Sequence, residues 1–352
     1  MTEDEFGEPA GRESDKIPRD GFGRPILPHP LTGERQSWTR PTTLAGSLSD
    51  KYNLNMWSKR MAARGFVARP DLLALVQAAT LPDPLDKSAD RELDALIKRA
   101  EEAGGAGAGA NIGTARHEFS RRIDADPDPR SALVPLVPVE HRPYLAAYLD
   151  AMEANGLATF HDFIEVMTVT PEIGCAGTFD RLLTGRSKHP MIGDLKTAKL
   201  DSIHYAWLEI AIQLGVYAHS THYWRGGKWH EHVDPIDQGI GIVMHLPNDL
   251  PPERARCDLY EVDIARGWDL ALMAKQVREV RTPAATRSLS RPLKGAEVVV
   301  KVDEIPMDWL VVIARATERA DLSDVWRAAN AAGQWTPELA AAGQARLREI
   351  EG

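Results

Sequence analysis

The chain has 352 residues, of which 43% are hydrophobic and 26% charged, and its formal net charge at pH 7 is -9. No apolar run is long enough to span a membrane, and the first residues hold no apolar signal-peptide core, so we expect neither a membrane protein nor a secreted one. Two cysteines cannot form a disulfide framework, which favours a cytoplasmic protein. The acidic balance does not indicate nucleic-acid binding, although such binding needs only a local basic stripe.

The first third of the chain predicts an arm followed by helices. Residues 1–36 are rich in Gly, Pro and charge and have no apolar period, so we expect an extended or disordered arm. Residues 37–111 carry apolar positions at helical spacing and predict a helical region. The dense glycines of residues 103–111 predict a loop at its end, because glycine sustains helices poorly.

Residues 112–282 carry the pattern of a mixed α/β core. Helices are expected over residues 114–124, 140–155, 202–224 and 266–280, with a Pro-rich connection between the first two. Strands are expected over residues 163–170, 175–183, 191–197, 228–234, 239–246 and 259–264. The turn-rich TGRSKHP joins the second and third strands into a hairpin. Helices precede and interrupt the strands, which predicts a small mixed sheet flanked by helices.

The end of the chain predicts a linker over residues 283–301 and a short helical C-terminal module over residues 302–352. Trp309, Trp326 and Trp335 are the largest apolar side chains of this module. They predict a small core or a docking face, and packing against the preceding region is the favoured alternative.

The predicted hairpin gathers charged residues that suit phosphodiester hydrolysis. In MIGDLKT, strand alternation places Ile192, Asp194 and Lys196 on one face, and the hairpin brings Asp180 opposite Asp194. Two hard carboxylate ligands suit Mg²⁺ or Mn²⁺, and a lysine beside them orients water or stabilises developing negative charge. An isolated D-x-K is more often a salt-bridged surface hairpin, so this spacing decides nothing alone.

Three further features point to the same region. His117 lies off the apolar stripe of its predicted helix, where it is placed to reach a site as a neutral imidazole. Gln213 and Tyr217 are four residues apart on the helix predicted over 202–224 and therefore share one face. Gly177 and Thr178 precede Asp180 and leave room for a phosphate or another backbone to approach.

Taken in order, these motifs resemble the RecB-like branch of the PD-(D/E)XK nuclease superfamily, especially its phage exonucleases. The resemblance covers residues 42–280 and rests on four motifs in this order: GTARH (His117), GTFD (Asp180), GDLKTAK (Asp194, Lys196) and QLGVY (Gln213, Tyr217). A single strand–turn–strand separates the two aspartates. IEVMTV with Glu165 is also similar. Each motif is weak alone, and the four in this order are strong.

The resemblance implies a restriction-endonuclease-like core with helical additions at both ends. It also implies a metal-dependent DNA nuclease, an exonuclease acting in phage or bacterial DNA recombination, repair or replication, and located in the host cytoplasm if a phage encodes it. In that family the His and both Asp bind the metal with a main-chain carbonyl, here that of Leu195, and the Lys is catalytic. The Gln and Tyr line the site or touch DNA, and Glu165 is an accessory acid.

Several relatives in that family carry four cysteines for an iron–sulfur cluster. Cys175 and Cys257 cannot supply four ligands, so we expect no cluster. The chain has no Walker A motif and is not itself a helicase, so a recombination or helicase partner would be a separate protein. Two alternatives stay open: a structure-specific endonuclease, and a non-catalytic DNA-binding or scaffolding protein on the same fold. A scaffold would be expected to lose a metal carboxylate or the lysine, whereas all are present.

Two other sets of residues are candidates for binding. Arg116, Arg121 and Lys199 flank the expected centre and are candidate phosphate contacts, although solvated charge is the ordinary role of such residues. The motifs HSTH and HEH form a candidate zinc site, because their spacings point pairs of imidazoles in one direction; their histidines are His219, His222, His230 and His232. Exposed histidines at helix ends and strand edges are common, which weighs against zinc.

Overall fold

The computed structural model describes residues 17–79, 89–282, 286, 289, 309–331 and 333–351. The chain divides into two compact units, Met1–Ser288 and Leu289–Gly352, which we call the main unit and the C-terminal unit. The division falls inside the segment expected to be a linker, residues 283–301. No helix within the described ranges combines the length and the apolar character needed to cross a membrane.

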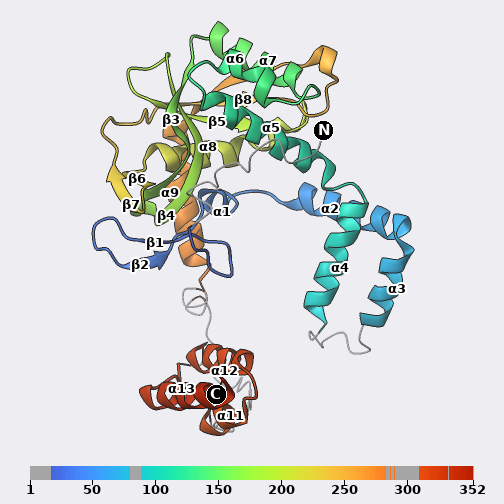
Figure 1. Cartoon of the computed structure of the whole chain (residues 1–352), viewed down its shortest axis with the longest axis vertical. Coiled ribbons are helices and arrows are strands. Elements are labelled where there is room, and N and C mark those ends of the chain that lie inside the picture. The colour runs from blue at the N-terminus through green and yellow to red at the C-terminus, as the bar shows by residue number, and fades with distance from the viewer. Residues whose placement is uncertain are drawn as a thin grey trace. The chain divides into compact units, whose positions relative to one another are not determined.

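A seven-stranded sheet organises the main unit, with the strand order β7-β6-β3-β4-β5-β8-β9 (Figure 1). In chain order its strands are Ala158–Thr170 (β3), Cys175–Thr184 (β4), Met191–Lys196 (β5), His222–Arg225 (β6), Lys228–Glu231 (β7), Ile240–His245 (β8) and Asp258–Asp263 (β9). Strands β5 and β8 pair in parallel, and every other neighbouring pair is antiparallel. The predicted hairpin is β4–β5, and the sheet is mixed, as expected.

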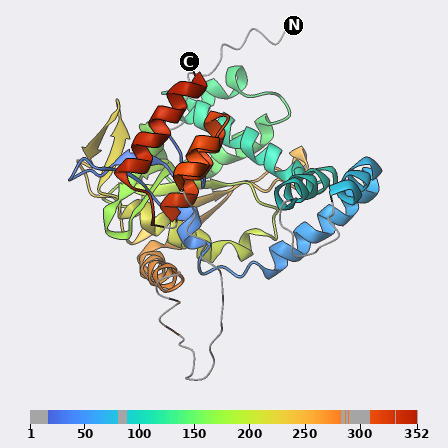
Figure 2. The same cartoon turned by 90° about the horizontal axis from the view of Figure 1, so that it is seen from below.

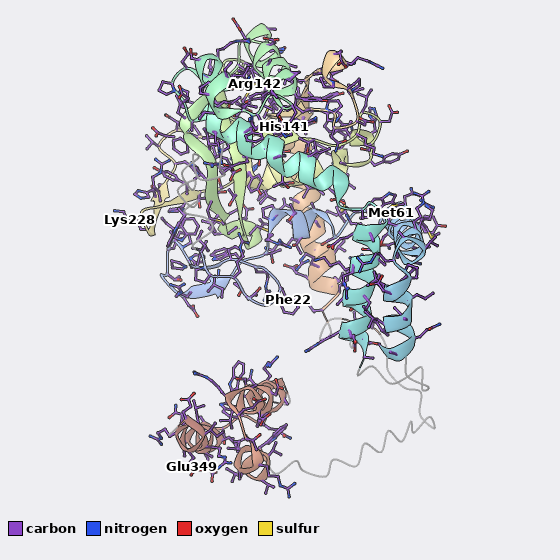
Figure 3. The ribbon with its side chains drawn as sticks, turned by 45° about the vertical axis from the view of Figure 1, so that its right-hand side comes forward. Phe22, Met61, His141, Arg142, Lys228 and Glu349 are labelled. Atoms are coloured by element: carbon purple, nitrogen blue, oxygen red, sulfur yellow. The ribbon has the colours of Figure 1, made fainter. Side chains whose placement is uncertain are left out.

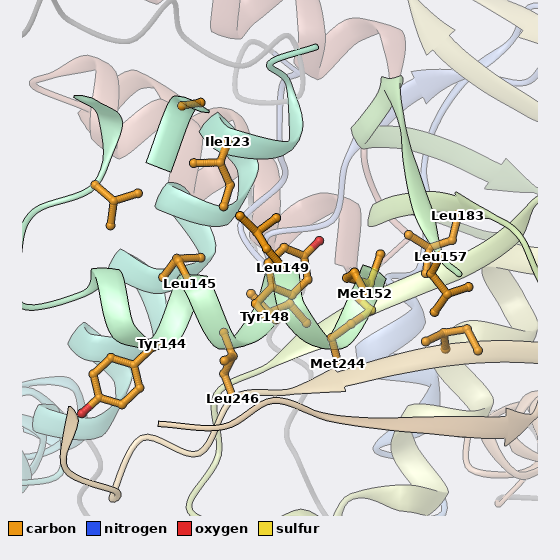
Figure 4. Close-up of a cluster of buried hydrophobic side chains, with 14 of the residues drawn as sticks. Ile123, Tyr144, Leu145, Tyr148, Leu149, Met152, Leu157, Leu183, Met244 and Leu246 are labelled. Carbon is orange, nitrogen blue, oxygen red and sulfur yellow. The ribbon is translucent and has the colours of Figure 1, made fainter. Parts of the chain in front are cut away.

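Helices cover both faces of this sheet, which confirms the expected α/β class. On one face lie Ala108–Asp124 (α5), Pro129–Leu136 (α6) and Arg142–Ala154 (α7). Figure 4 shows the apolar side chains of α7, among them Leu145 and Tyr148, in one buried cluster with Leu183 and Met244 of the sheet. On the other face lies Trp207–Ala218 (α8), whose apolar residues pack on the sheet. Pro41–Ala45 (α1) and Ile264–Val280 (α9) pack in turn against α8 (Figure 2).

The alternation predicted for β5 is confirmed by these two cores. Met191 and Leu195 belong to the cluster under α7, whereas Ile192 belongs to the cluster under α8. A strand buried on both faces sends alternate side chains into different cores. Asp194 therefore sits between apolar layers and is itself buried.

The N-terminal segment differs from the arm expected over residues 1–36. Within it, Ile26–Pro28 (β1) pairs with Arg35–Ser37 (β2) in a two-stranded antiparallel hairpin. Leu27 and Trp38 are buried against Val169 of the main sheet. The sequence did not reveal this because the anchors are single large apolar residues without a period. Residues 1–16 lie outside the described residues.

A helical arm follows, made of Tyr52–Ala68 (α2), Pro70–Ala79 (α3) and Asp90–Ala103 (α4). The backbones of helices α2 and α4 pack directly against each other. A Cβ added to Gly65 would stand 1.7 Å from the Ala100 carbonyl oxygen. A Cβ added to Gly104 would stand 2.1 Å from the carbonyl oxygen of Met61, which Figure 3 labels. The loop expected over residues 103–111 is shorter than predicted, because α5 already begins at Ala108.

Two other elements correct the sequence prediction. The Pro-rich connection contains α6, whose first turn is capped by the Asp128 carboxylate accepting from the Ser131 N–H. The helix expected over 202–224 is a short 3-10 turn, Ile203–Tyr205, followed by α8, and the chain then turns into β6. Gly226 and Gly227, both with positive φ, close a tight hairpin between β6 and β7.

The C-terminal unit is a small three-helix structure in its described part, with Trp309–Arg315 (α11), Arg319–Ala331 (α12) and Pro337–Glu351 (α13). Ile313, Val325 and Leu339 form its buried core, and Trp309 and Trp335 pack against them. The unit thus has a small core of its own, one of the predicted alternatives. Trp326, in contrast, is 48% exposed.

Candidate active site

The centre of the site lies where the β4–β5 ladder ends. This ladder runs from Leu183↔Met191 to Arg181↔Gly193. Beyond it, the Leu195 main-chain N–H donates to Oδ2 of the Asp180 side chain at 2.9 Å. Since the N–H and C=O of one strand residue point to the same edge, the Leu195 carbonyl faces this opening as well.

Asp194 and Lys196 lie together at the carboxyl end of β5. The Lys196 Nζ is 2.7 Å from Oδ2 of Asp194 in a close ion pair, and the Asp194 side chain is buried. The Lys196 side chain is 27% exposed, so its ammonium is reachable from solvent. The pair therefore combines a buried acceptor with an accessible cation.

The charges at this point shift one another's protonation. Burial raises the pKa of Asp194 to about 6, because the Lys196 charge offsets only part of the desolvation and Asp180 adds repulsion. Burial works to lower the pKa of Lys196, yet the charges of Asp194 and Asp180 outweigh it and raise that pKa above its ordinary value. Lys196 is therefore an ammonium at neutral pH.

His117 reaches this group from α5. Its Nδ1 lies 3.7 Å from Oδ2 of Asp180, and the two side chains are 31% and 23% exposed. The helix approaches the end of β5 closely, since a Cβ on Gly113 would stand 2.5 Å from Oγ1 of Thr197. Glycine one turn before His117 thus lets α5 carry the imidazole to the strand end.

Gln213 and Tyr217 form the wall of the site on α8. The Gln213 Nε2 donates to the Tyr217 hydroxyl at 3.4 Å, so the two share a face as predicted. Tyr217 is buried edge-on against Phe179, and its pKa is raised by burial and by the carboxylates of Asp180 and Asp194. Tyr217 therefore packs behind the carboxylates, and Gln213 is the more exposed of the pair.

The three candidate phosphate contacts, Arg116, Arg121 and Lys199, differ in burial and in their partners. Arg116 is buried, donates to the Pro247 carbonyl at 3.0 Å and lies 3.5 Å from the centroid of the Tyr144 ring. Little of Arg116 is therefore exposed on the surface for a phosphate, because its guanidinium packs on Tyr144. Arg121 is engaged with Glu118 in a close ion pair, whereas Lys199 is exposed.

Glu165 occupies the register position opposite Asp180. The flanking pairs are Ile164↔Arg181 and Val166↔Phe179, next to an irregularity in the β3–β4 ladder. Among the described non-glycine residues, Glu165 alone has positive φ, at 52°. Such a conformation is costly for glutamate and is often found beside functional sites.

The zinc hypothesis is not supported by the geometry. Its four histidines are His219, His222, His230 and His232, and each of them contacts other side chains: His222, for example, lies 3.8 Å from Glu231 through Nε2. His219 stacks on Trp268 and His230 on Tyr223, while His232 contacts the Ser220 hydroxyl through Nε2 at 3.1 Å. Across the described ranges, no three His, Cys, Asp or Glu side chains are arranged to hold a metal ion.

His117, Asp180 and Asp194 are likewise not arranged as a metal-binding group in this structure. One oxygen of each carboxylate is turned to a protein cation or N–H: Oδ2 of Asp194 to Lys196, and Oδ2 of Asp180 to Leu195. The donor chemistry nevertheless fits a hard divalent cation. Two carboxylates and an imidazole lie close together, and the buried Asp194 Oδ2 has the Lys196 ammonium as its close contact.

Sequence reasoning missed a buried polar cluster behind the site. The Arg181 Nη1 lies 2.8 Å from Oδ2 of Asp124 and donates to the Tyr148 hydroxyl at 2.7 Å, while its Nη2 donates to Oγ of Ser120 at 3.1 Å. One signal was present. Arg116, Ser120 and Asp124 recur every four residues and therefore form a polar stripe on α5, and all three are buried.

The chain matches no protein-family model, and no curated protein is significantly similar to it.

Proposed function

We propose that this chain is a metal-dependent DNA nuclease of the PD-(D/E)XK type, and an exonuclease of the RecB-like kind. One observation supports the proposal above all. His117, Asp180, Asp194 and Lys196 come from a helix and two strands, yet they adjoin at the carboxyl end of β5. The carboxyl ends of parallel strands, here β5 and β8, are where α/β sheets commonly bind ligands.

Asp180, Asp194, His117 and the Leu195 carbonyl would hold Mg²⁺ or Mn²⁺ in this proposal. When bound, the cation supplies Lewis acidity that polarises the scissile phosphate and makes water acidic enough to attack it. Asp194 must be a carboxylate for this task, and its pKa of about 6 leaves it ionised at neutral pH. The accessory acid Glu165 lies opposite Asp180 in register and is half-buried.

Lys196 acts as a donor in this scheme. Its raised pKa keeps it protonated, so it cannot serve as a general base at neutral pH. Instead the ammonium donates hydrogen bonds that orient the attacking water or stabilise negative charge on the phosphate oxygens. Asp194 holds the ammonium 2.7 Å away and so fixes its position.

DNA is the proposed polymeric partner, with contacts from Lys199 and Gln213. A positive side chain beside the centre binds phosphate without reading sequence, which suits a nuclease that moves along a strand. Arg121 contacts the DNA in this proposal only if its ion pair with Glu118 breaks. Two cysteines leave no four-cysteine iron–sulfur cluster in this proposal. In this proposal the nuclease works in phage or bacterial DNA recombination, repair or replication in the cytoplasm. A helicase or recombination protein that works with it would be a separate chain.

One gel assay tests the proposal. The purified chain is incubated with end-labelled and with circular DNA, each single- and double-stranded, in Mg²⁺, Mn²⁺ or EDTA. We expect cleavage of linear DNA with either metal and none in EDTA or with Asp194→Ala. Cutting of circles would instead indicate the endonuclease alternative. DNA binding without cleavage in either metal would indicate the scaffolding alternative and refute the proposal.

A further inference from the structure

A chain of hydrogen bonds joins the backbone next to Asp180 to the backbone of His117. Arg181 follows Asp180 on β4 and is only 2% exposed. Its Nη2 donates to Oγ of Ser120 at 3.1 Å, and that hydroxyl donates onward to the His117 carbonyl at 2.8 Å. The two residues that meet at the front of the site are thus also linked behind it.

The same guanidinium is held by a second pair of residues. Asp124, one turn after Ser120 on α5, pairs with Arg181 at 2.8 Å, and the Tyr148 hydroxyl donates to both oxygens of Asp124 at 3.0 Å each. Tyr148 lies in the apolar cluster between α7 and the sheet, where Figure 4 labels it. Three elements, α5, α7 and β4, therefore meet at one buried cation.

Stability alone does not account for such a cluster. Burying an arginine and an aspartate costs several kcal/mol of desolvation, and well-packed apolar replacements are often equally stable. What a hydrogen-bonded polar cluster adds is one defined arrangement of the elements that carry it, and in the Arg181 guanidinium only Nε lacks a partner. A ligand set tolerates misplacement of only about 0.5 Å, so the arrangement of α5 against β4 matters for metal binding.

We propose that the Arg181 network, formed with Ser120, Asp124 and Tyr148, positions His117 against Asp180 and thereby sets the affinity of the centre for a divalent cation. The inference rests on the proposed function, because it concerns the same metal site. These residues touch neither substrate nor metal and act only through His117 and Asp180. They are positioning residues.

Two single-hydroxyl deletions test this, and the chain supplies a matched control. Tyr148→Phe removes the hydroxyl between Asp124 and Arg181, and Ser120→Ala removes the link to His117. Tyr144→Phe is the control: Tyr144 is also buried on α7, and its hydroxyl donates to the Leu250 carbonyl at 2.6 Å, away from the network. Each full-length variant is titrated with Mn²⁺ by calorimetry, unfolded in urea and assayed on linear DNA.

We expect Tyr148→Phe and Ser120→Ala to weaken Mn²⁺ binding roughly tenfold, as loss of supporting contacts around metal ligands commonly does. Tyr144→Phe should stay within about twofold of wild type, because it keeps the ring that packs on Arg116 and removes no hydrogen bond of the Arg181 network. Tyrosine variants of similar stability but different Mn²⁺ affinity exclude a merely structural role. Equal Mn²⁺ affinity in Tyr148→Phe and Tyr144→Phe would overturn the inference.

The outcomes for the wild type separate this inference from the proposed function. If the wild type binds Mn²⁺ and the variants differ as expected, but no DNA is cleaved, the nuclease proposal fails and the positioning role stands. If the wild type cleaves DNA and Ser120→Ala binds Mn²⁺ normally, the positioning role fails and the nuclease stands. A wild type that binds no Mn²⁺ at all overturns both.

Discussion

The carboxylate of Asp180 accepts the main-chain N–H of Leu195 at 2.9 Å, one step beyond the last pair of the β4–β5 ladder. A side chain thus continues the bonding between strands where backbone pairing stops. The consequence is an opening at the strand ends that presents the Leu195 carbonyl beside two carboxylates.

Removing one member of the centre should abolish cleavage. We expect Asp180→Ala, Asp194→Ala and Lys196→Ala each to lower the cleavage rate on linear DNA by roughly a thousandfold or more, because charge stabilisation at the reacting phosphate is lost. Circular dichroism should show native secondary structure in all three. Wild-type rates in Asp194→Ala would show that the centre is assigned wrongly.

The metal-free protein should gain stability when Asp194 is neutralised. The folded-state pKa of Asp194, about 6, lies above its ordinary 3.8, so the folded state binds more protons between these pH values. Stability is therefore lost as pH rises through this window. In EDTA, the stability of Asp194→Asn relative to wild type should rise by roughly 1–3 kcal/mol between pH 4 and pH 7.5, because only the wild type loses this proton.

Adding Mn²⁺ gives the control for that experiment. At pH 7.5 the metal should raise the unfolding midpoint of the wild type and leave Asp194→Asn almost unchanged, because a ligand stabilises only the state that binds it. A stability difference between wild type and Asp194→Asn that stays the same from pH 4 to pH 7.5 in EDTA would contradict the burial-driven pKa shift.

His117 should govern how much metal the reaction needs. With His117→Ala, we expect the half-saturating metal concentration to rise roughly tenfold, as loss of one ligand contact does. Mn²⁺ should restore more activity than Mg²⁺, since Mn²⁺ binds more strongly than Mg²⁺ to a site from which one ligand is missing. Titrating both metals in the cleavage assay checks this. An equal loss in both metals at every concentration would point to DNA positioning instead.

The hairpin and the positions of its charged residues were predictable because they are local. Strand alternation placed Ile192 apart from Met191 and Leu195, and turn residues between β4 and β5 predicted their pairing. The residues of α5 that face the sheet were harder to predict from the sequence. Its buried positions include Arg116, Ser120 and Asp124, and polar residues are predicted as surface until their partners are known.

Long-range partners also explain the other differences between the structure and the sequence prediction. Arg116 is buried because the Pro247 carbonyl and the Tyr144 ring, far along the chain, receive it. The hairpin β1–β2 packs on the main sheet because Trp38 is buried against it. The Trp38 Nε1 donates to the Leu27 carbonyl at 3.1 Å. Neither contact leaves a periodic trace in the sequence.

Gln213 should act on DNA placement. It lies on α8 with its amide against the Tyr217 hydroxyl, and it holds no position among the carboxylates. Gln213→Ala should raise KM for DNA several-fold while Mn²⁺ affinity stays within about threefold. Tyr217→Phe, which keeps the buried ring, is the companion variant. A calorimetric titration of Gln213→Ala that shows no Mn²⁺ binding would refute the assignment.

The C-terminal unit should be dispensable for the chemistry. Its core is formed by its own residues, with Ile313, Val325 and Leu339 packed against Trp309 and Trp335, and the residues of the proposed centre all belong to the main unit. A chain ending at Arg291 should therefore keep metal-dependent cleavage of short oligonucleotides at a near wild-type rate. It should lose processivity on long DNA first, because a second unit adds a second point of attachment. Comparing both chains on a short oligonucleotide and on a linear plasmid measures this. A folded truncated chain that cleaves neither substrate would show that the C-terminal unit helps to build the active site.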